Sequence, residues 1–134
     1  MTAGKGKCLC GAVRVTAESI ETHHGACHCR MCRRWASGPL FAALAHGVSF
    51  EGEENVAVYD SSEWAERGFC KVCGSNLFYR LKEPGLYFLS VGIFDEPADF
   101  TLGSEVCIDH KPAGYDFAGD RPRKTEAEVF AEFS

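Results

Sequence analysis

Hydrophobic and polar residues alternate in short stretches along this chain, and turn signals separate the stretches. In residues 10–18, two valines alternate with Arg14 and Thr16, which predicts a half-buried strand. Residues 39–47 are almost entirely apolar and predict a more deeply buried strand. Four further short stretches are separated by turn signals, and they predict strands at 55–61, 66–70, 75–81 and 86–94. The pattern therefore predicts a mainly β fold.

Helix signals are sparse by comparison. Residues 29–36 are compatible with one short helical turn. Near the C-terminus, Thr125 and Glu128 have the spacing of a capping box, and they precede the apolar residues Val129, Phe130 and Phe133. Residues 109–124 are rich in proline, glycine and aspartate and predict an irregular segment. We therefore expect an α+β chain with little helix and one short C-terminal helix.

The length and composition fit one globular domain that spans residues 1–134. Hydrophobic residues make up 46% of the chain and charged residues 25%, which is close to the average for globular proteins. The formal net charge of −5 argues against nucleic acid as a partner, because phosphate binding depends on an excess of Lys and Arg. The composition alone gives no oligomeric state.

No stretch of the sequence has the apolar length of a signal peptide or of a membrane span. We therefore expect a cytoplasmic protein without a membrane partner. In that reducing compartment, eight cysteines in a short chain indicate metal ligands or catalytic thiols rather than disulfides.

Four of the cysteines form two pairs with the spacing of zinc ligands. If Cys8 and Cys10 lie in a strand, both thiols point to one face, whereas Cys70 and Cys73 form a C-x-x-C knuckle that Gly74 follows. Together the pairs predict a closed structural zinc site with four thiolates. The alternatives are a redox C-x-x-C and ordinary buried thiols, but a thioredoxin-type motif opens a helix, and this one leads into a predicted strand.

A second cluster combines both spacings within six residues. Cys27 and Cys29 form C-x-C, and Cys29 and Cys32 form C-x-x-C, so three thiolates can bind one metal ion. If the other two cysteine pairs bind a first zinc ion, a zinc ion at this second cluster has three protein ligands and keeps an open fourth position. An open position is typical of catalytic zinc and can accept water or a substrate thiolate.

Four residues compete for this fourth position. Strand alternation turns His28 away from its two neighbouring cysteines, and His23 and His24 fit surface positions. Cys107 is the serious rival, although a lone cysteine is commonly a small buried residue. If Cys107 binds, the second site is closed and catalytically inert.

Three arginines surround the second cluster, namely Arg30, Arg33 and Arg34. They would offset the negative charge of a zinc ion with three thiolates. They would also attract an anionic thiol substrate, because arginine binds carboxylates through paired hydrogen bonds. The alternative is a solvated basic turn.

The cysteine motifs GKCLCGAVRV, CHCRMCRRWASG and FCKVCGSNLF, in this order, resemble the glutathione-dependent formaldehyde-activating enzyme family, whose domain is shared with centromere protein V. The later segments SVGIFDEP and residues 105–128 also resemble the family. The resemblance implies a zinc-stabilised β-tent fold with two zinc ions. It implies structural ligands at Cys8, Cys10, Cys70 and Cys73, and a catalytic site at Cys27, Cys29 and Cys32.

The activity that the resemblance implies is the joining of formaldehyde and glutathione to S-hydroxymethylglutathione, a carbon–sulfur lyase reaction in the cleaving direction. A small-molecule thiol and an aldehyde are the expected partners, with glutathione as co-substrate. The chain departs from the family pattern at Gly114, where an aromatic residue is usual, with Tyr115 following. The alternatives are a non-catalytic zinc-stabilised interaction module with two closed sites, and a thiol redox protein.

Overall fold

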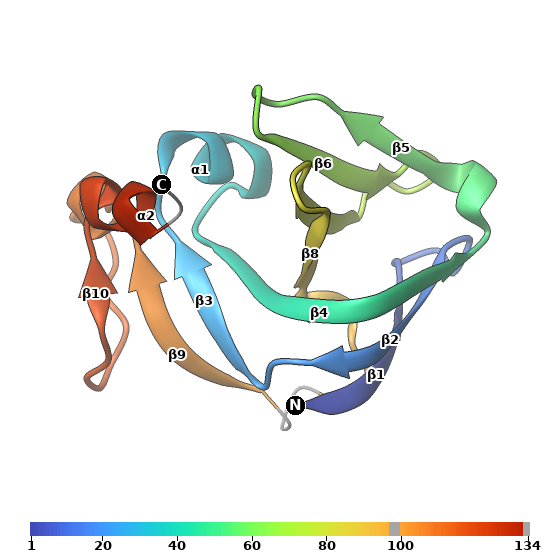
Figure 1. Ribbon diagram of the computed structural model, residues 1–134, viewed down its shortest axis with the longest axis horizontal. Helices are drawn as coiled ribbons and strands as arrows, with labels where there is room; N and C mark the ends of the chain where they lie inside the picture. The colour runs from blue at the N-terminus through green and yellow to red at the C-terminus, as the bar shows by residue number, and fades with distance from the viewer. Residues whose placement is uncertain (97–99, 133–134) are drawn as a thin grey trace.

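The computed structural model describes residues 1–96 and 100–132, and nearly half of them lie in one strongly curved β-sheet (Figure 1). Within those residues the strands are β1 (Thr2–Lys7), β2 (Arg14–Ile20), β3 (His23–Cys27), β4 (Leu40–Glu51), β5 (Val56–Tyr59), β6 (Ala65–Cys70), β7 (Asn76–Leu81), β8 (Leu86–Ser90), β9 (Thr101–Val106) and β10 (Arg123–Lys124). The mainly β fold predicted from the alternating pattern is therefore confirmed.

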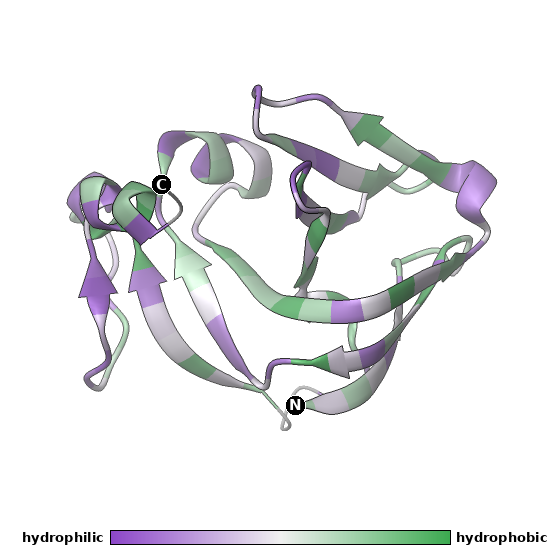
Figure 2. Cartoon of the chain, in the orientation of Figure 1, coloured by the Kyte–Doolittle hydropathy of each residue, from purple (hydrophilic) through white to green (hydrophobic). Residues whose placement is uncertain are grey.

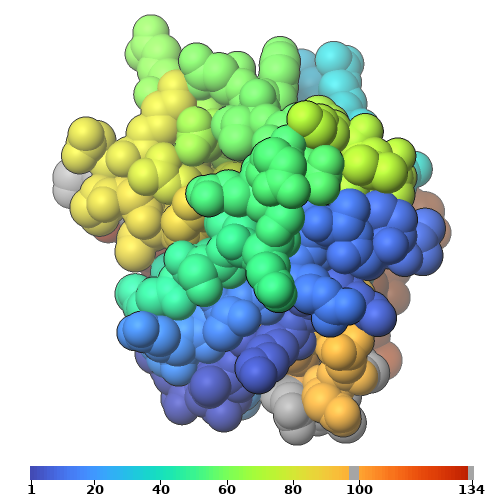
Figure 3. All heavy atoms as spheres, turned by 90° about the vertical axis from the view of Figure 1, so that its right-hand side faces the viewer, coloured from blue at the N-terminus to red at the C-terminus, as the bar shows by residue number. Residues whose placement is uncertain are grey.

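The long strand β4 organises the sheet. The strand order is β10-β9-β3-β4-β8-β7-β6-β5, and β2 also pairs with β4, with β1 on its far side. In the view of Figure 3, the segment around residue 50 lies between the N-terminal segment on one side and the residues around 80 on the other. Because β3 and β9 are parallel, their carboxyl ends meet at one place, and Cys27 pairs with Val106 there.

Two seven-residue helices complete the fold. Helix α1 (Arg30–Ala36) follows β3, and helix α2 (Glu126–Glu132) lies near the C-terminus. The predicted capping box is present, because Glu128 N donates to Thr125 Oγ1 at 3.3 Å and Thr125 N donates to Glu128 Oε1 at 3.0 Å. Phe133, an expected apolar position of α2, lies outside the described residues.

Two sequence predictions need correction. The strand predicted over 86–94 ends at Ser90, because Val91–Ile93 form a 3₁₀ turn that leads Phe94 back to Gly6 of β1. Strand β1 was missed because its glycines carry no hydrophobic pattern. They are needed for close approach, since a Cβ on Gly6 would lie 2.5 Å from the carbonyl oxygen of Ile93.

Strands β3 and β9 were also not predicted as strands. The irregular segment expected over 109–124 is largely confirmed, apart from the two residues of β10.

The hydrophobic core lies between β2, β4 and the β7–β8 hairpin. Its buried members are Cys8, Val13, Val15, Ala17, Ile20, Ala43, Ala45, Cys70, Leu77, Phe78, Leu89, Ile93 and Phe94. In Figure 2, hydrophilic residues gather on β10 and on the turn between β4 and β5. In the described part of the chain, neither helix has the length or the apolar character to cross a membrane.

Candidate metal centres

The first cysteine cluster joins two distant parts of the chain. The Sγ atoms of Cys8, Cys10, Cys70 and Cys73 all lie within 4.8 Å of one another. Cys8 and Cys10 Sγ are 3.6 Å apart, and Cys10 and Cys70 Sγ are 3.8 Å apart. Tetrahedral zinc with Zn–S bonds of about 2.3 Å requires S···S distances of about 3.8 Å. The four thiols therefore fit a closed tetrahedral metal site.

Tight turns position these thiols, and of the four only Cys70 lies in a strand, at the end of β6. The sequence predicted Cys8 and Cys10 within a strand, but β1 ends at Lys7, and Gly11 N donates to the Cys8 carbonyl at 3.1 Å. Gly74 N likewise donates to the Cys70 carbonyl at 2.7 Å. Gly11 and Gly74 have φ of 80° and 81°, which a residue with a Cβ rarely adopts. Leu9 points away from the thiols and is 88% exposed.

The thiols of this cluster differ in acidity because they compete for protons. The hydroxyl and backbone N–H of Ser75 lower the pKa of Cys73 to about 5. The backbone N–H of Ala12 favours the Cys10 thiolate, but burial and the neighbouring thiols outweigh it and raise the pKa of Cys10 to about 11. Like charges at this spacing do not ionise together without a cation. Metal binding would therefore release protons from the cluster.

The second cluster forms where β3 passes into α1. The Sγ atoms of Cys27, Cys29 and Cys32 lie within 4.8 Å of one another. Cys27 ends β3, whereas Cys29 is the N-cap of α1 and accepts a hydrogen bond from Cys32 N at 3.3 Å. The pKa of Cys29 is lowered because the thiols of Cys107, Cys27 and Cys32 donate to its sulfur. The helix start therefore brings three thiols to one point.

Cys107 lies next to this cluster but is not a member of it. It follows β9 directly, in the left-handed conformation with φ of 54°, and its thiol interacts with those of Cys27 and Cys29. Among the described residues, the group whose Sγ atoms all lie within 4.8 Å contains only Cys27, Cys29 and Cys32. The parallel pairing of β3 and β9 explains why Cys107 is near, and its backbone turn explains its different position.

The arginines expected near the second cluster are placed unevenly. Arg30 and Arg34 are exposed, whereas the Arg33 side chain donates through Nε to the His28 carbonyl at 3.0 Å. The structure instead places Arg67 of β6 against the cluster, with Nη1 donating to Cys32 Sγ at 3.5 Å. The sequence did not point to Arg67, because Arg67 and Cys32 are 35 positions apart and no local motif links them. Only the tertiary fold brings the two side chains together.

His28 directly follows the end of β3 and is fully buried. Its Nε2–H donates to Glu105 Oε1 at 2.8 Å, which leaves Nδ1 to accept from the Tyr115 hydroxyl at 2.9 Å. Glu105 also accepts from Arg121 Nη1 at 2.8 Å and from Arg123 Nε at 2.9 Å. The network ties the irregular segment to β3 and β9 and occupies both nitrogens of His28, so it accounts for His28 without a metal.

We expect Glu105→Gln to lower the free energy of unfolding by about 3–5 kcal/mol, because the buried arginine and histidine lose their charged partner. Burial alone would raise the pKa of Glu105, but hydrogen bonds from Arg121, His28 and Arg123 outweigh it and lower the pKa. Because the pKa of Glu105 is lower in the folded protein than in the unfolded chain, its ionisation stabilises the fold at pH values above the unfolded-state pKa of about 4.3. This stabilisation is lost as the pH falls through the folded-state pKa. Urea denaturation at pH 7 and pH 4 measures both effects.

Asp116→Asn is the matched control for Glu105, because Lys111 lowers the pKa of this exposed carboxylate as well. An exposed ion pair contributes about 0–1 kcal/mol, so this variant should stay near the wild type. Equal stability losses in the two variants would contradict a dominant role for the buried network.

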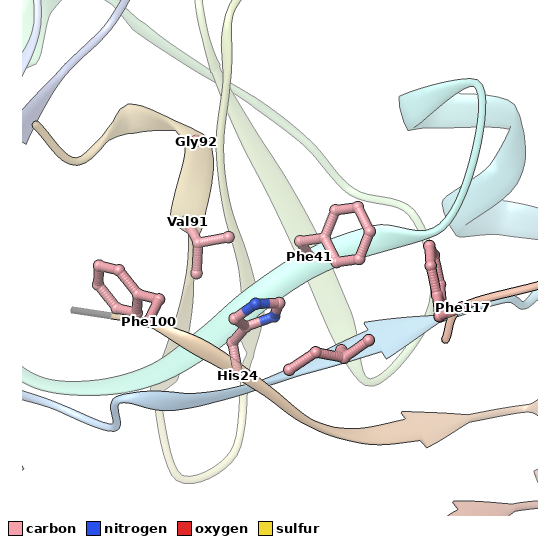
Figure 4. Close-up of a pocket in the computed structure, with 7 residues that line it drawn as sticks. His24, Phe41, Val91, Gly92, Phe100 and Phe117 are labelled. Carbon is pink, nitrogen blue, oxygen red and sulfur yellow. The ribbon is translucent and has the colours of Figure 1, made fainter. Parts of the chain in front are cut away.

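A separate apolar pocket of about 380 Å³ lies beside the His28 network (Figure 4). Figure 4 shows His24, Phe41 and Phe117 on one side of it and Val91 and Phe100 on the other. His24 and Cys27 are three positions apart in β3, so their side chains project from opposite faces. The pocket is therefore distinct from the cysteine cluster.

Comparison with known proteins identifies the family of this chain. The sequence profile of the family described as glutathione-dependent formaldehyde-activating enzyme matches residues 3–108. A Schizosaccharomyces pombe protein named as an uncharacterized lyase is 40% identical over 129 residues, which cover 93% of each chain. A Penicillium rubens protein whose name assigns it provisionally to this family is 34% identical over 104 residues. That match covers 69% of this chain and 54% of the Penicillium protein, so the chain spans about half of that relative.

A solved structure supports the same relationship. The crystal structure of a Rhodobacter sphaeroides protein matches with a TM-score of 0.59 and 25% sequence identity, covering 89% of this chain and 98% of that chain. The profile match covers most of the chain and includes both cysteine clusters. The chain therefore belongs to the glutathione-dependent formaldehyde-activating enzyme family.

Proposed function

We propose that the chain is a zinc-dependent carbon–sulfur lyase that joins a small aldehyde to a thiol and cleaves the adduct in the reverse direction. Family membership and the names of its relatives as lyase and formaldehyde-activating enzyme support an enzyme of this kind. Formaldehyde and glutathione are the proposed aldehyde and thiol. Because all eight cysteines are free, the proposal places the protein in the reducing cytoplasm.

The observation that carries this proposal is the difference between the two clusters. The first cluster groups four thiols, whereas the second groups three. Zinc held by three protein ligands keeps one position for a substrate, and zinc held by four thiolates does not. Cys8, Cys10, Cys70 and Cys73 would therefore hold a structural zinc, and Cys27, Cys29 and Cys32 a catalytic one.

The three thiols are well suited to hold an ion in a fixed place. Cys29 is anchored by its hydrogen bond from the Cys32 backbone, and Cys32 accepts from Arg67. A zinc ion bound there would lower the pKa of a substrate thiol so that it is a thiolate at neutral pH. The thiolate sulfur would attack the aldehyde carbon, so that a C–S bond forms while the carbonyl π bond breaks. Its electrons would move to oxygen, which would take a proton from solvent. Holding both reactants together supplies much of the rate.

A second candidate function follows from the position of Cys107. Its thiol interacts with those of Cys27 and Cys29, so a shift toward Cys32 would make it a fourth ligand. The protein would then be a non-catalytic interaction module with two closed zinc sites. Cys107→Ser separates the two functions, because the variant should keep both metal ions only if Cys107 is not a ligand.

The proposed function predicts two zinc ions per chain and a faster exchange between glutathione, formaldehyde and S-hydroxymethylglutathione than the uncatalysed reaction. Mass spectrometry of metals measures the first, and exchange NMR at increasing protein concentration measures the second. Cys107→Ser is the control and should retain both properties. Exchange that does not depend on protein concentration, or loss of one zinc in Cys107→Ser, would overturn the proposal.

A further inference from the structure

Arg67 is a buried cation next to the second cysteine cluster. Only 4% of its surface is exposed, and in residues 1–96 and 100–132 no carboxylate lies within ion-pair distance of it. Among the described residues, the acceptor that Arg67 contacts is Cys32 Sγ, which receives a hydrogen bond from Arg67 Nη1. A buried arginine without a carboxylate is costly unless another anion compensates its charge. The acceptor that Arg67 contacts belongs to the cysteine cluster, so we expect the compensating negative charge at that cluster.

Two aromatic rings hold the guanidinium of Arg67 in place. Its Cζ atom lies 5.2 Å from the centre of the Trp35 ring and 5.0 Å from that of Tyr79. Trp35 belongs to α1, and Asn76 of β7 donates through Nδ2 to the backbone carbonyl of Trp35 at 3.4 Å. A guanidinium has more N–H donors than the one used on Cys32, and they lie in its plane. The remaining donors are therefore fixed in direction before any ligand arrives.

Strand pairing places Arg67 on the same face of the sheet as Cys27. Directly paired residues share a face, as do residues two or four positions apart in a strand. Cys27 pairs with Leu40 of β4, and Leu44 lies four positions further along that strand. Leu44 pairs with Phe88 of β8, Phe88 pairs with Tyr79 of β7, and Tyr79 pairs with Arg67. The guanidinium and the thiols therefore face the same space over the sheet.

The same face carries a buried hydroxyl that lacks a hydrogen-bond partner in the part of the chain that the structure describes. Ser90 pairs with Ala42, two positions from Leu40, so it shares this face. Its Oγ atom is buried and has no hydrogen-bond partner among the described residues. Buried hydroxyls are usually hydrogen-bonded, so an unpaired one indicates a missing partner.

We propose that Arg67 is the anion-binding residue of the Cys27–Cys29–Cys32 site and that it binds a negatively charged oxygen one or two carbons from the substrate sulfur. This inference rests on the proposed function and names its substrate class. When a thiolate attacks an aldehyde, the C–S bond forms and the carbonyl π electrons move to oxygen, which becomes an oxyanion on the carbon next to sulfur. Arg67 stabilises that oxyanion until it takes a proton from solvent.

Binding of two small thiols tests this proposal without any turnover. Mercaptoacetate carries a carboxylate near its sulfur, and 2-mercaptoethanol is similar in size but neutral. Titration calorimetry of the zinc-loaded protein gives the ratio of their dissociation constants. We expect this ratio to favour mercaptoacetate about ten- to a hundredfold more in the wild type than in Arg67→Met, as for hydrogen bonds to a charged group. Comparing the ratio in both proteins cancels the different acidities of the two thiols.

Arg80→Met is the matched control for the loss of an arginine. Arg80 lies on the adjacent strand β7, pairs with Glu66 at 3.0 Å and stacks on Tyr87. This variant should keep the wild-type ratio. Arg67→Lys keeps the charge without the planar donors and should give an intermediate ratio, and it replaces Arg67→Met if that variant does not fold. Metal content and circular dichroism confirm that each variant is folded.

The possible outcomes separate this inference from the proposed function. An unchanged ratio in a folded Arg67 variant with two zinc ions overturns the role of Arg67, because a purely structural role does not move that ratio. If the wild type prefers mercaptoacetate but does not accelerate adduct exchange, the proposed function fails and the anion site stands. If both hold, Arg67→Met should also lower the exchange rate by about 10²–10³-fold.

Discussion

Replacing Cys70 with serine is expected to abolish cooperative folding. Cys70 is fully buried at the end of β6, and its cluster ties residues 8–10 to residues 70–73. A structural zinc contributes about 10–16 kcal/mol of apparent binding free energy, and a native domain is stable by only about 5–15 kcal/mol. Serine removes a thiolate and leaves the core without its link. Circular dichroism and thermal denaturation measure the loss.

Cys107→Ser is the matched control, because Cys107 is also buried but lies outside both clusters. We expect this variant to unfold cooperatively and close to the wild type. A cooperative transition in Cys70→Ser at the wild-type temperature would show that the first cluster is not a structural metal site.

Replacing Cys29 with serine is expected to remove the activity and keep the fold. Cys29 is the N-cap of α1, and serine is a preferred N-cap, so the hydrogen bond from Cys32 N is retained. The thiolate is lost, and zinc should fall from two ions to one per chain. Loss of a residue that only supports a metal ligand costs about 10–100-fold in activity, so loss of a ligand should bring the exchange rate to the uncatalysed level.

Cys29→Ser is a cleaner test than a change at Cys32, because Cys32 is buried and accepts a hydrogen bond from Arg67. Thermal denaturation of Cys29→Ser should stay cooperative. If the variant unfolds as completely as Cys70→Ser does, the second cluster is structural as well. If it keeps two zinc ions and full activity, Cys29 is not a ligand.

Local patterns predicted the parts of the fold that depend on local interactions. The alternation in β2 and the capping box of α2 involve side chains only a few residues apart, and both are present in the structure. Strand β1 was missed because its glycines are selected by the close approach of Ile93 and Phe94, which are distant in sequence. A hydrophobic pattern records burial of side chains, and a glycine has none to bury.

The sequence by itself determined the division of seven cysteines into three spaced groups and the family to which the chain belongs. Ligand spacing is a short-range property of a turn or helix start, so it can be read along the chain. The sequence also predicted that Cys8 and Cys10 share a site with Cys70 and Cys73, and the structure places these four thiols together. Only the tertiary structure brought Arg67 to Cys32 and His28 to Glu105. These contacts depend on strand order and register, which arise from the packing of the whole sheet. They cannot be predicted from the residue type at any one position.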